Sequence, residues 1–135
     1  MDSEEIKPDI LLVDDEADFL RAVSQRLEAR GFKTDSVTSG EAALEKIKGK
    51  NYNIVVLDLV MPGMGGMEVL KTIKKLYPDL PVLILTGQGT TAQAVAAMKE
   101  GAMDYMEKPA DIETLIHKTL EARHKRLSSL AESAI

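Results

Sequence analysis

The sequence ILLVDDEADFL, residues 10–20, changes abruptly from aliphatic residues to three consecutive acids. Its first part, Ile10–Val13, shows no polar alternation, which is typical of a strand buried on both faces of a sheet. An amphipathic segment follows at Ala17–Arg30 and predicts a helix, which Gly31 is placed to stop. The acids between them, Asp14–Glu16, repel one another and resist dehydration beside an apolar strand. We therefore expect a cation to be held against them.

The same alternation of apolar runs and amphipathic segments continues along the chain, and it predicts a parallel sheet with helices on both faces. Further strands are expected at Lys33–Val37, Ile54–Leu57, Val82–Leu85 and Asp104–Glu107. Further helices are expected after Thr38, which forms a capping box with Glu41, then at about Met67–Tyr77 and Thr91–Glu100, and from an Asp111 cap to about Ser128. The predicted fold class is α/β with a doubly wound, five-stranded parallel sheet.

Composition and charge limit the classes of protein to which this chain can belong. The chain has 135 residues, 44% hydrophobic and 29% charged, which fits one folded domain. We expect an N-terminal tail over 1–8, the domain over 9–122, and the end of the last helix with a tail or linker over 123–135. The net charge of -5 argues against direct binding of nucleic acid or an anionic membrane. No segment is apolar enough to span a membrane, so we expect a cytoplasmic protein.

Polar side chains stand at the carboxyl ends of four predicted strands. Asp14 and Asp15 follow the first strand, Asp58 the third, Thr86 the fourth and Lys108 the fifth. In a doubly wound sheet, ligands bind beyond the carboxyl ends of the strands, where the winding direction reverses. We therefore expect these groups to converge. Hard oxygen ligands of this kind suit Mg²⁺ or Mn²⁺.

The same groups fit phosphoryl transfer. A carboxylate beside Mg²⁺ can attack phosphorus and form an aspartyl phosphate. Asp58 is the expected nucleophile because it stands alone, whereas the acidic pair after the first strand suits a metal. Lys108 offers a fixed positive charge, Thr86 a hydroxyl and Gly87 a backbone N–H to the phosphoryl oxygens.

Four motifs in this order and spacing resemble the receiver domain of two-component response regulators. They are LLVDDE at 11–16, VVLDLVMPGMGG at 55–66, ILTGQG at 84–89 and DYMEKP at 104–109. The resemblance covers about residues 8–122 and implies a flavodoxin-like (βα)5 fold with strand order 2-1-3-4-5. The TGQG form at 86–89 resembles receivers attached to enhancer-binding transcriptional activators.

The resemblance implies a role for each of these positions. It makes Asp58 the acceptor of a phosphoryl group from a phosphohistidine, carried by a sensor histidine kinase or a phosphotransfer protein. Asp15 and Asp58 become direct Mg²⁺ ligands, together with the Val60 carbonyl, and Asp14 acts through a metal-bound water. Thr86 and Lys108 contact the phosphoryl oxygens. The Lys108–Pro109 peptide is expected to be cis, turning the lysine into the site.

The resemblance also implies a switch rather than an enzyme with an external substrate, although the domain promotes its own phosphorylation and dephosphorylation. Phosphorylation would draw the Thr86 hydroxyl inward and let Tyr105 rotate. The surface formed by the helix at 91–100, the strand at 104–107 and the last helix would then change. A downstream protein or a covalently linked effector domain would read that surface, and a homodimer through it is a further option.

Two other functions share part of this pattern. A hydrolase of the haloacid-dehalogenase type also forms an aspartyl phosphate, but it needs a second Asp two residues after the nucleophile, where this chain has Val60. A binding module that has lost phosphorylation would not need all the reacting groups, yet all are present. Alone, Tyr105 would fit a half-buried strand aromatic and Thr86 a turn residue. Their combination with Asp58 and Lys108 favours the receiver.

Overall fold

The structure is a computed structural model that describes residues 8–87 and 90–133, with side-chain surroundings described up to residue 125. The strands are β1 (Asp9–Val13), β2 (Lys33–Val37), β3 (Ile54–Leu57), β4 (Val82–Thr86) and β5 (Asp104–Glu107). The helices are α1 (Ala17–Ala29), α2 (Gly40–Gly49), α3 (Gly66–Leu76), α4 (Thr91–Lys99) and α5 (Ile112–Ser133). Three parts of the chain lie outside the described residues: 1–7 of the predicted N-terminal tail, Gln88 and Gly89 of the TGQG motif, and 134–135.

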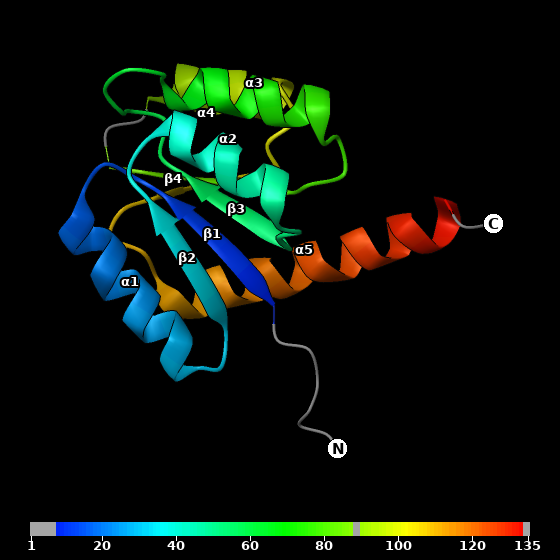
Figure 1. Cartoon of the computed structure of the whole chain (residues 1–135). Helices are drawn as coiled ribbons and strands as arrows, with labels where there is room; N and C mark the ends of the chain where they lie inside the picture. Colours follow the sequence, from blue (N-terminus) through cyan, green and yellow to red (C-terminus); the bar gives the residue numbers. More distant parts are fainter. Residues whose placement is uncertain (1–7, 88–89, 134–135) are drawn as a thin grey trace.

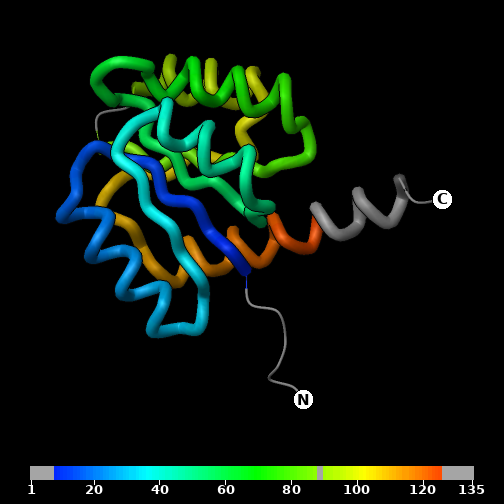
Figure 2. The backbone as a smooth tube through the Cα atoms, viewed as in Figure 1, coloured from blue at the N-terminus to red at the C-terminus, as the bar shows by residue number. Residues whose placement is uncertain are grey.

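The five strands form one parallel sheet in the order β2-β1-β3-β4-β5, which confirms the predicted topology. Helices α1 and α5 lie on one face of the sheet, and α2, α3 and α4 lie on the other (Figure 1). Alternate strand residues point to the two faces, so each face has its own apolar core. Because the strands are parallel, the chain leaves β1, β3 and β4 at one edge of the molecule (Figure 2).

The predicted capping box at the start of α2 was wrong. Ser39, not Thr38, is the N-cap, with φ -147° and ψ 159°, and its hydroxyl accepts a hydrogen bond from the Ala42 N–H at 3.1 Å. Serine and threonine both cap helices, so the sequence offered two adjacent starts. The end of α5 was also misplaced, because the helix continues to Ser133 rather than ending near Ser128. The segment between these positions contains neither Gly nor Pro to stop it.

The start of α3 packs directly on the backbone that carries Asp58. The Gly66 N–H donates to the Leu59 carbonyl at 3.1 Å. A Cβ atom at position 66 would lie 2.1 Å from the Asp58 carbonyl oxygen and 2.5 Å from the Leu59 Cα. Only glycine permits this approach. The turn after β3 therefore fixes the position of Asp58.

Within the described part of the chain, no helix has both the length and the apolar character needed to cross a lipid bilayer.

Candidate functional site

Asp14 and Asp58 are brought side by side by the register of two neighbouring strands. Val13 pairs with Leu57, so the two acids are the next residues along β1 and β3. Their backbones continue the sheet, because the Asp14 N–H donates to Val37 and the Asp58 N–H donates to Val13. Both side chains are buried, with exposed fractions of 2% for Asp14 and 5% for Asp58. The sheet thus places two carboxylates close together in a site of low solvent access.

Asp15 completes a cluster of three acids. One carboxylate oxygen from each of Asp14, Asp15 and Asp58 lies within 4.8 Å of the others. Burial raises the pKa of Asp14 above its ordinary value, and the charge of Asp58 adds to this effect, whereas hydrogen bonds from Lys108 and the Glu16 amide oppose it. The cluster supplies hard oxygen donors without sulfur or nitrogen, a donor set that fits Mg²⁺.

Lys108 reaches this cluster from the end of β5, where its N–H donates to the Thr86 carbonyl at 3.0 Å. Its Nζ lies 2.7 Å from Asp14 Oδ2, 2.5 Å from Glu16 Oε1 and 3.5 Å from Asp58 Oδ2. Burial lowers the pKa of Lys108, but the bonds to Asp14 and Glu16 outweigh it and hold the pKa above its ordinary value. The side chain therefore stays an ammonium. The peptide bond to the following proline is cis.

These groups border a cavity of about 280 Å³. It is lined by Asp15, Glu16, Asp58, Val60, Thr86, Gly87 and Lys108. The Val60 N–H donates to Asp58 Oδ1 at 3.1 Å, which fixes the orientation of the carboxylate. The cavity has room for a phosphoryl group beside Asp58 and for an ion with its waters.

Tyr105 does not line this cavity. Its side chain is half-buried and packs against the core under α2, α3 and α4. Within the described residues, its hydroxyl is buried without a hydrogen-bond partner. Burial raises the pKa of Tyr105, and the charges of Glu107 and Asp58 raise it further. Tyr105 therefore lies outside the cavity but within the electrostatic influence of Asp58.

The structure brings together all the predicted site residues except Tyr105, and it adds two that sequence reasoning missed. Glu16 was expected only to help hold a cation as one of three consecutive acids, and its contact with Lys108 was not predicted. Gly66 entered the sequence analysis only as the last residue of the motif VVLDLVMPGMGG. The signal for Glu16 was its place beside the acidic pair. For Gly66, the close backbone approach becomes visible only in three dimensions.

Comparison with known proteins identifies the family. The model of the response regulator receiver domain matches residues 10–120. The C4-dicarboxylate transport transcriptional regulatory protein DctD of Rhizobium meliloti (strain 1021) is 37% identical over 119 residues, which are 88% of this chain and 26% of that protein. The transcriptional regulatory protein ZraR of Klebsiella oxytoca is 40% identical over 121 residues, 89% of this chain and 27% of that protein. Both are named as transcriptional regulators, in keeping with the predicted likeness to activators.

A solved structure agrees with this assignment. The CheY-like response regulator receiver domain protein from Methanospirillum hungatei JF-1 superposes with a TM-score of 0.86 and 27% identity, covering 92% of this chain and 99% of that one. By contrast, the chain spans about a quarter of the length of the two curated relatives. The chain belongs to the family of response regulator receiver domains, the phosphorylation-dependent switches of two-component signalling.

Proposed function

We propose that Asp58 accepts a phosphoryl group from a phosphohistidine of a sensor histidine kinase or phosphotransfer protein, in a reaction that requires Mg²⁺. The observation that carries this proposal is the position of the Asp58 carboxylate, which shares one cavity with Asp15 and Lys108. In the transfer, an Asp58 oxygen bonds to phosphorus while the bond from phosphorus to the imidazole nitrogen breaks. The released imidazole nitrogen takes up a proton.

The ion would be held by Asp15 and Asp58 directly, by the Val60 carbonyl, and by Asp14 through a water. The hydrogen bonds of Asp14 support this division. Its Oδ1 accepts from the Glu16 N–H at 2.9 Å and its Oδ2 pairs with Lys108 at 2.7 Å, whereas the corresponding contacts of Asp58 are longer, at 3.1 Å from the Val60 N–H and 3.5 Å from Lys108. Mg²⁺ bound here would neutralise carboxylate and phosphoryl charge. Mn²⁺ has the same preference for oxygen ligands and is proposed to substitute.

The remaining groups of the cavity suit the charge of a phosphoryl group in transit. Lys108 brings an ammonium, Thr86 a buried hydroxyl at the cavity wall, and Gly87 a backbone N–H without a side chain in the way. Groups that are positioned in advance stabilise this charge without having to reorganise during transfer. The same groups would promote hydrolysis of the phosphoryl group from Asp58.

The output would follow from a shift between two conformations. A phosphoryl dianion on Asp58 would draw in Thr86 and let Tyr105 rotate, and the Tyr105 hydroxyl has no hydrogen bond within the described residues to lose. Such coupling is typically about 1–3 kcal/mol. The surface of α4, β5 and α5 carries exposed apolar side chains, among them Val95, Met98 and Leu120, that a partner or a second copy could cover.

Membership of the family supports a proposal for the partners. We propose that a downstream protein or a linked effector domain reads this surface in the cytoplasm. The names of the relatives support control of transcription by the whole regulator. We also propose 9–122 as the receiver unit, which the family match over 10–120 supports.

Incubation with Mg²⁺ and a small acyl phosphate, followed by intact-mass measurement, tests the proposal. We expect one phosphoryl group per chain, none without Mg²⁺, and none in Asp58→Asn. Steady turnover of a phosphate monoester would instead support the haloacid-dehalogenase type of hydrolase. Absence of an adduct with acyl phosphates and with phosphohistidine donors would support the phosphorylation-silent binding module.

A further inference from the structure

The Lys108 ammonium meets an aromatic ring as well as the acids. Its Nζ lies 4.3 Å from the centroid of the Phe19 ring, on the first turn of α1. The Lys108 side chain is only 12% exposed, so this contact is largely shielded from water. An ammonium within about 6 Å of an aromatic centroid is attracted by the negative face of the ring, and the attraction grows as water is excluded.

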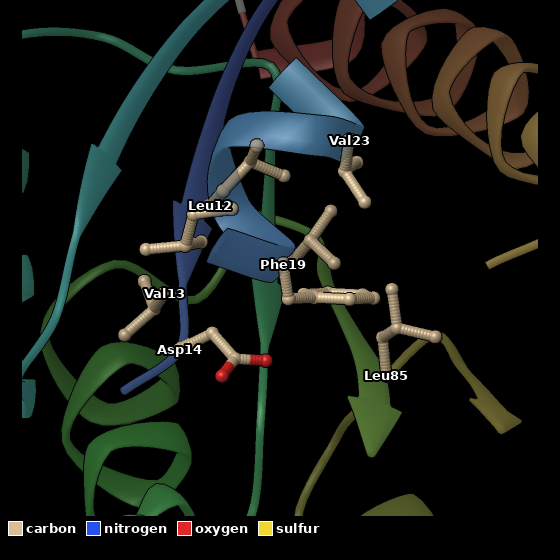
Figure 3. A pocket seen from close by; sticks show the side chains of 8 residues that line it. Leu12, Val13, Asp14, Phe19, Val23 and Leu85 are labelled. Carbon is tan, nitrogen blue, oxygen red and sulfur yellow. The ribbon is translucent and has the colours of Figure 1, made fainter. Parts of the chain in front are cut away.

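The ring is held in place by the apolar core. Phe19 packs against the core beneath α1 and α5, and it lines a narrow apolar pocket with side chains from β1, β3 and β4. Figure 3 shows the ring extending from α1 towards Leu85, with the Asp14 carboxylate close by. The position of the partly buried ring is therefore supported by apolar contacts that do not involve Lys108.

The acids alone do not fix the lysine. Lysine is a point charge on a flexible stem, without the planar fork that gives arginine a fixed geometry. Asp14 and Asp58 attract it inward, but Glu16 also pairs with it at 2.5 Å and has a side chain that is 61% exposed. Because the Glu16 carboxylate is largely exposed, movement of this ion pair towards the solvent would take the ammonium away from Asp58. The Phe19 ring adds an attraction on the buried side.

We propose that Phe19 is a positioning residue for Lys108: its ring holds the ammonium on the inner side of the site, near Asp14 and Asp58, and limits its movement towards the solvent together with the exposed Glu16 carboxylate. The consequence for phosphoryl transfer rests on the proposed function of Asp58. Because a cation–π contact shifts an equilibrium by roughly two- to five-fold even at exposed sites, its loss here should slow the transfer by about five-fold.

Two substitutions separate the ring from its volume. Phe19→Leu keeps an apolar side chain in the core but removes the aromatic face, whereas Phe19→Tyr keeps the face. With Mg²⁺ and a small acyl phosphate, we expect Phe19→Leu to form the adduct about five-fold more slowly than the wild type and Phe19→Tyr to match the wild type. Thermal unfolding should confirm that both variants are folded. In a Lys108→Met background, Phe19→Leu should slow adduct formation no further.

A second measurement does not depend on phosphorylation. The Hε protons of Lys108, assigned by their disappearance in Lys108→Met, should be shifted upfield by the ring in the wild type and should return to ordinary values in Phe19→Leu. An ordinary shift in the wild type, an unchanged rate in Phe19→Leu, or an equal slowing in the Lys108→Met background would each overturn the inference. A wild type that forms no adduct would instead overturn the proposed function, and the proton shifts would still decide the contact.

Discussion

Replacing Gly66 by Ala tests whether the turn after β3 fixes the phosphoryl acceptor. The new Cβ would start 2.1 Å from the Asp58 carbonyl oxygen, and separations below 3.0 Å are essentially never seen, so the backbone must open by about 0.9 Å. The atoms it meets belong to the backbone of Asp58 and Leu59, which are buried just beyond the end of β3, so no flexible side chain is there to give way. Overpacking of this kind costs about 1–3 kcal/mol, and we expect the upper end.

Stability and transfer should change together. A loss of about 3 kcal/mol lowers the melting temperature of a domain of this size by roughly 10 °C. Displacement of the nucleophile by about 1 Å can slow a reaction by about 100-fold. Urea unfolding and the rate of adduct formation measure the two effects.

Gly65→Ala is the matched control, because it is the same substitution one residue earlier. A Cβ at position 65 meets no atom within 4 Å, and its φ of -71° is ordinary for alanine. As an N-cap it should lose less than about 1 kcal/mol. Equal stabilities and equal transfer rates for the two variants would refute the argument that the contact of Gly66 with Asp58 holds the site in place.

Three further changes probe the charges of the protein. Lys108→Met removes an ammonium that lies 2.7 Å from Asp14 Oδ2. Mg²⁺ should therefore bind more tightly, whereas adduct formation should be slower. Weaker Mg²⁺ binding in titration calorimetry would count against a site shared by the ion and the lysine. Mg²⁺ at ten times its Kd should raise the free energy of unfolding of the wild type by about 1.4 kcal/mol, and that of Asp58→Asn by less at the same concentration. If thermal unfolding shows the same stabilisation of both proteins, Asp58 is not a ligand of the ion. The Tyr52 hydroxyl, 2.7 Å from Asp35, is the main cause that lowers the pKa of Asp35. A lowered carboxyl pKa adds stability above the ordinary value of about 3.9, and this stability is lost as the pH falls through the lower folded value. Tyr52→Phe should therefore be less stable than the wild type at neutral pH, with the difference narrowing below about pH 4; urea unfolding that gives a constant difference would contradict this.

The order of the helices and strands and most of the residues that line the cavity were predictable, because the local sequence patterns are those that a parallel sheet requires. Buried strands read as unbroken apolar runs, and the polar residue after each strand must lie at the same edge of the sheet. That is why Asp58 and Lys108, 50 positions apart in the sequence, were expected in one cavity.

The features that the sequence analysis missed depend on distances between residues, which the spacing of apolar residues along the sequence does not give. The amphipathic pattern of 17–30 predicted the helix that carries Phe19, but it could not show that the ring lies under the lysine at the end of β5. Glu16 has the charge that a lysine attracts, yet only the path of the chain brings the two together. The choice between Thr38 and Ser39 as the N-cap depended on backbone geometry, because either side chain can make the bond.

Chemical trapping of the acceptor tests the central claim most directly. Borohydride reduces an acyl phosphate to an alcohol, so a phosphorylated aspartate is converted to homoserine, which peptide mass mapping can locate. After incubation with Mg²⁺ and a small acyl phosphate, we predict homoserine at position 58 alone, and none when Mg²⁺ is withheld. Homoserine at another aspartate, or the same yield at position 58 without a divalent ion, would contradict a site in which the three acids and Lys108 act together around Mg²⁺.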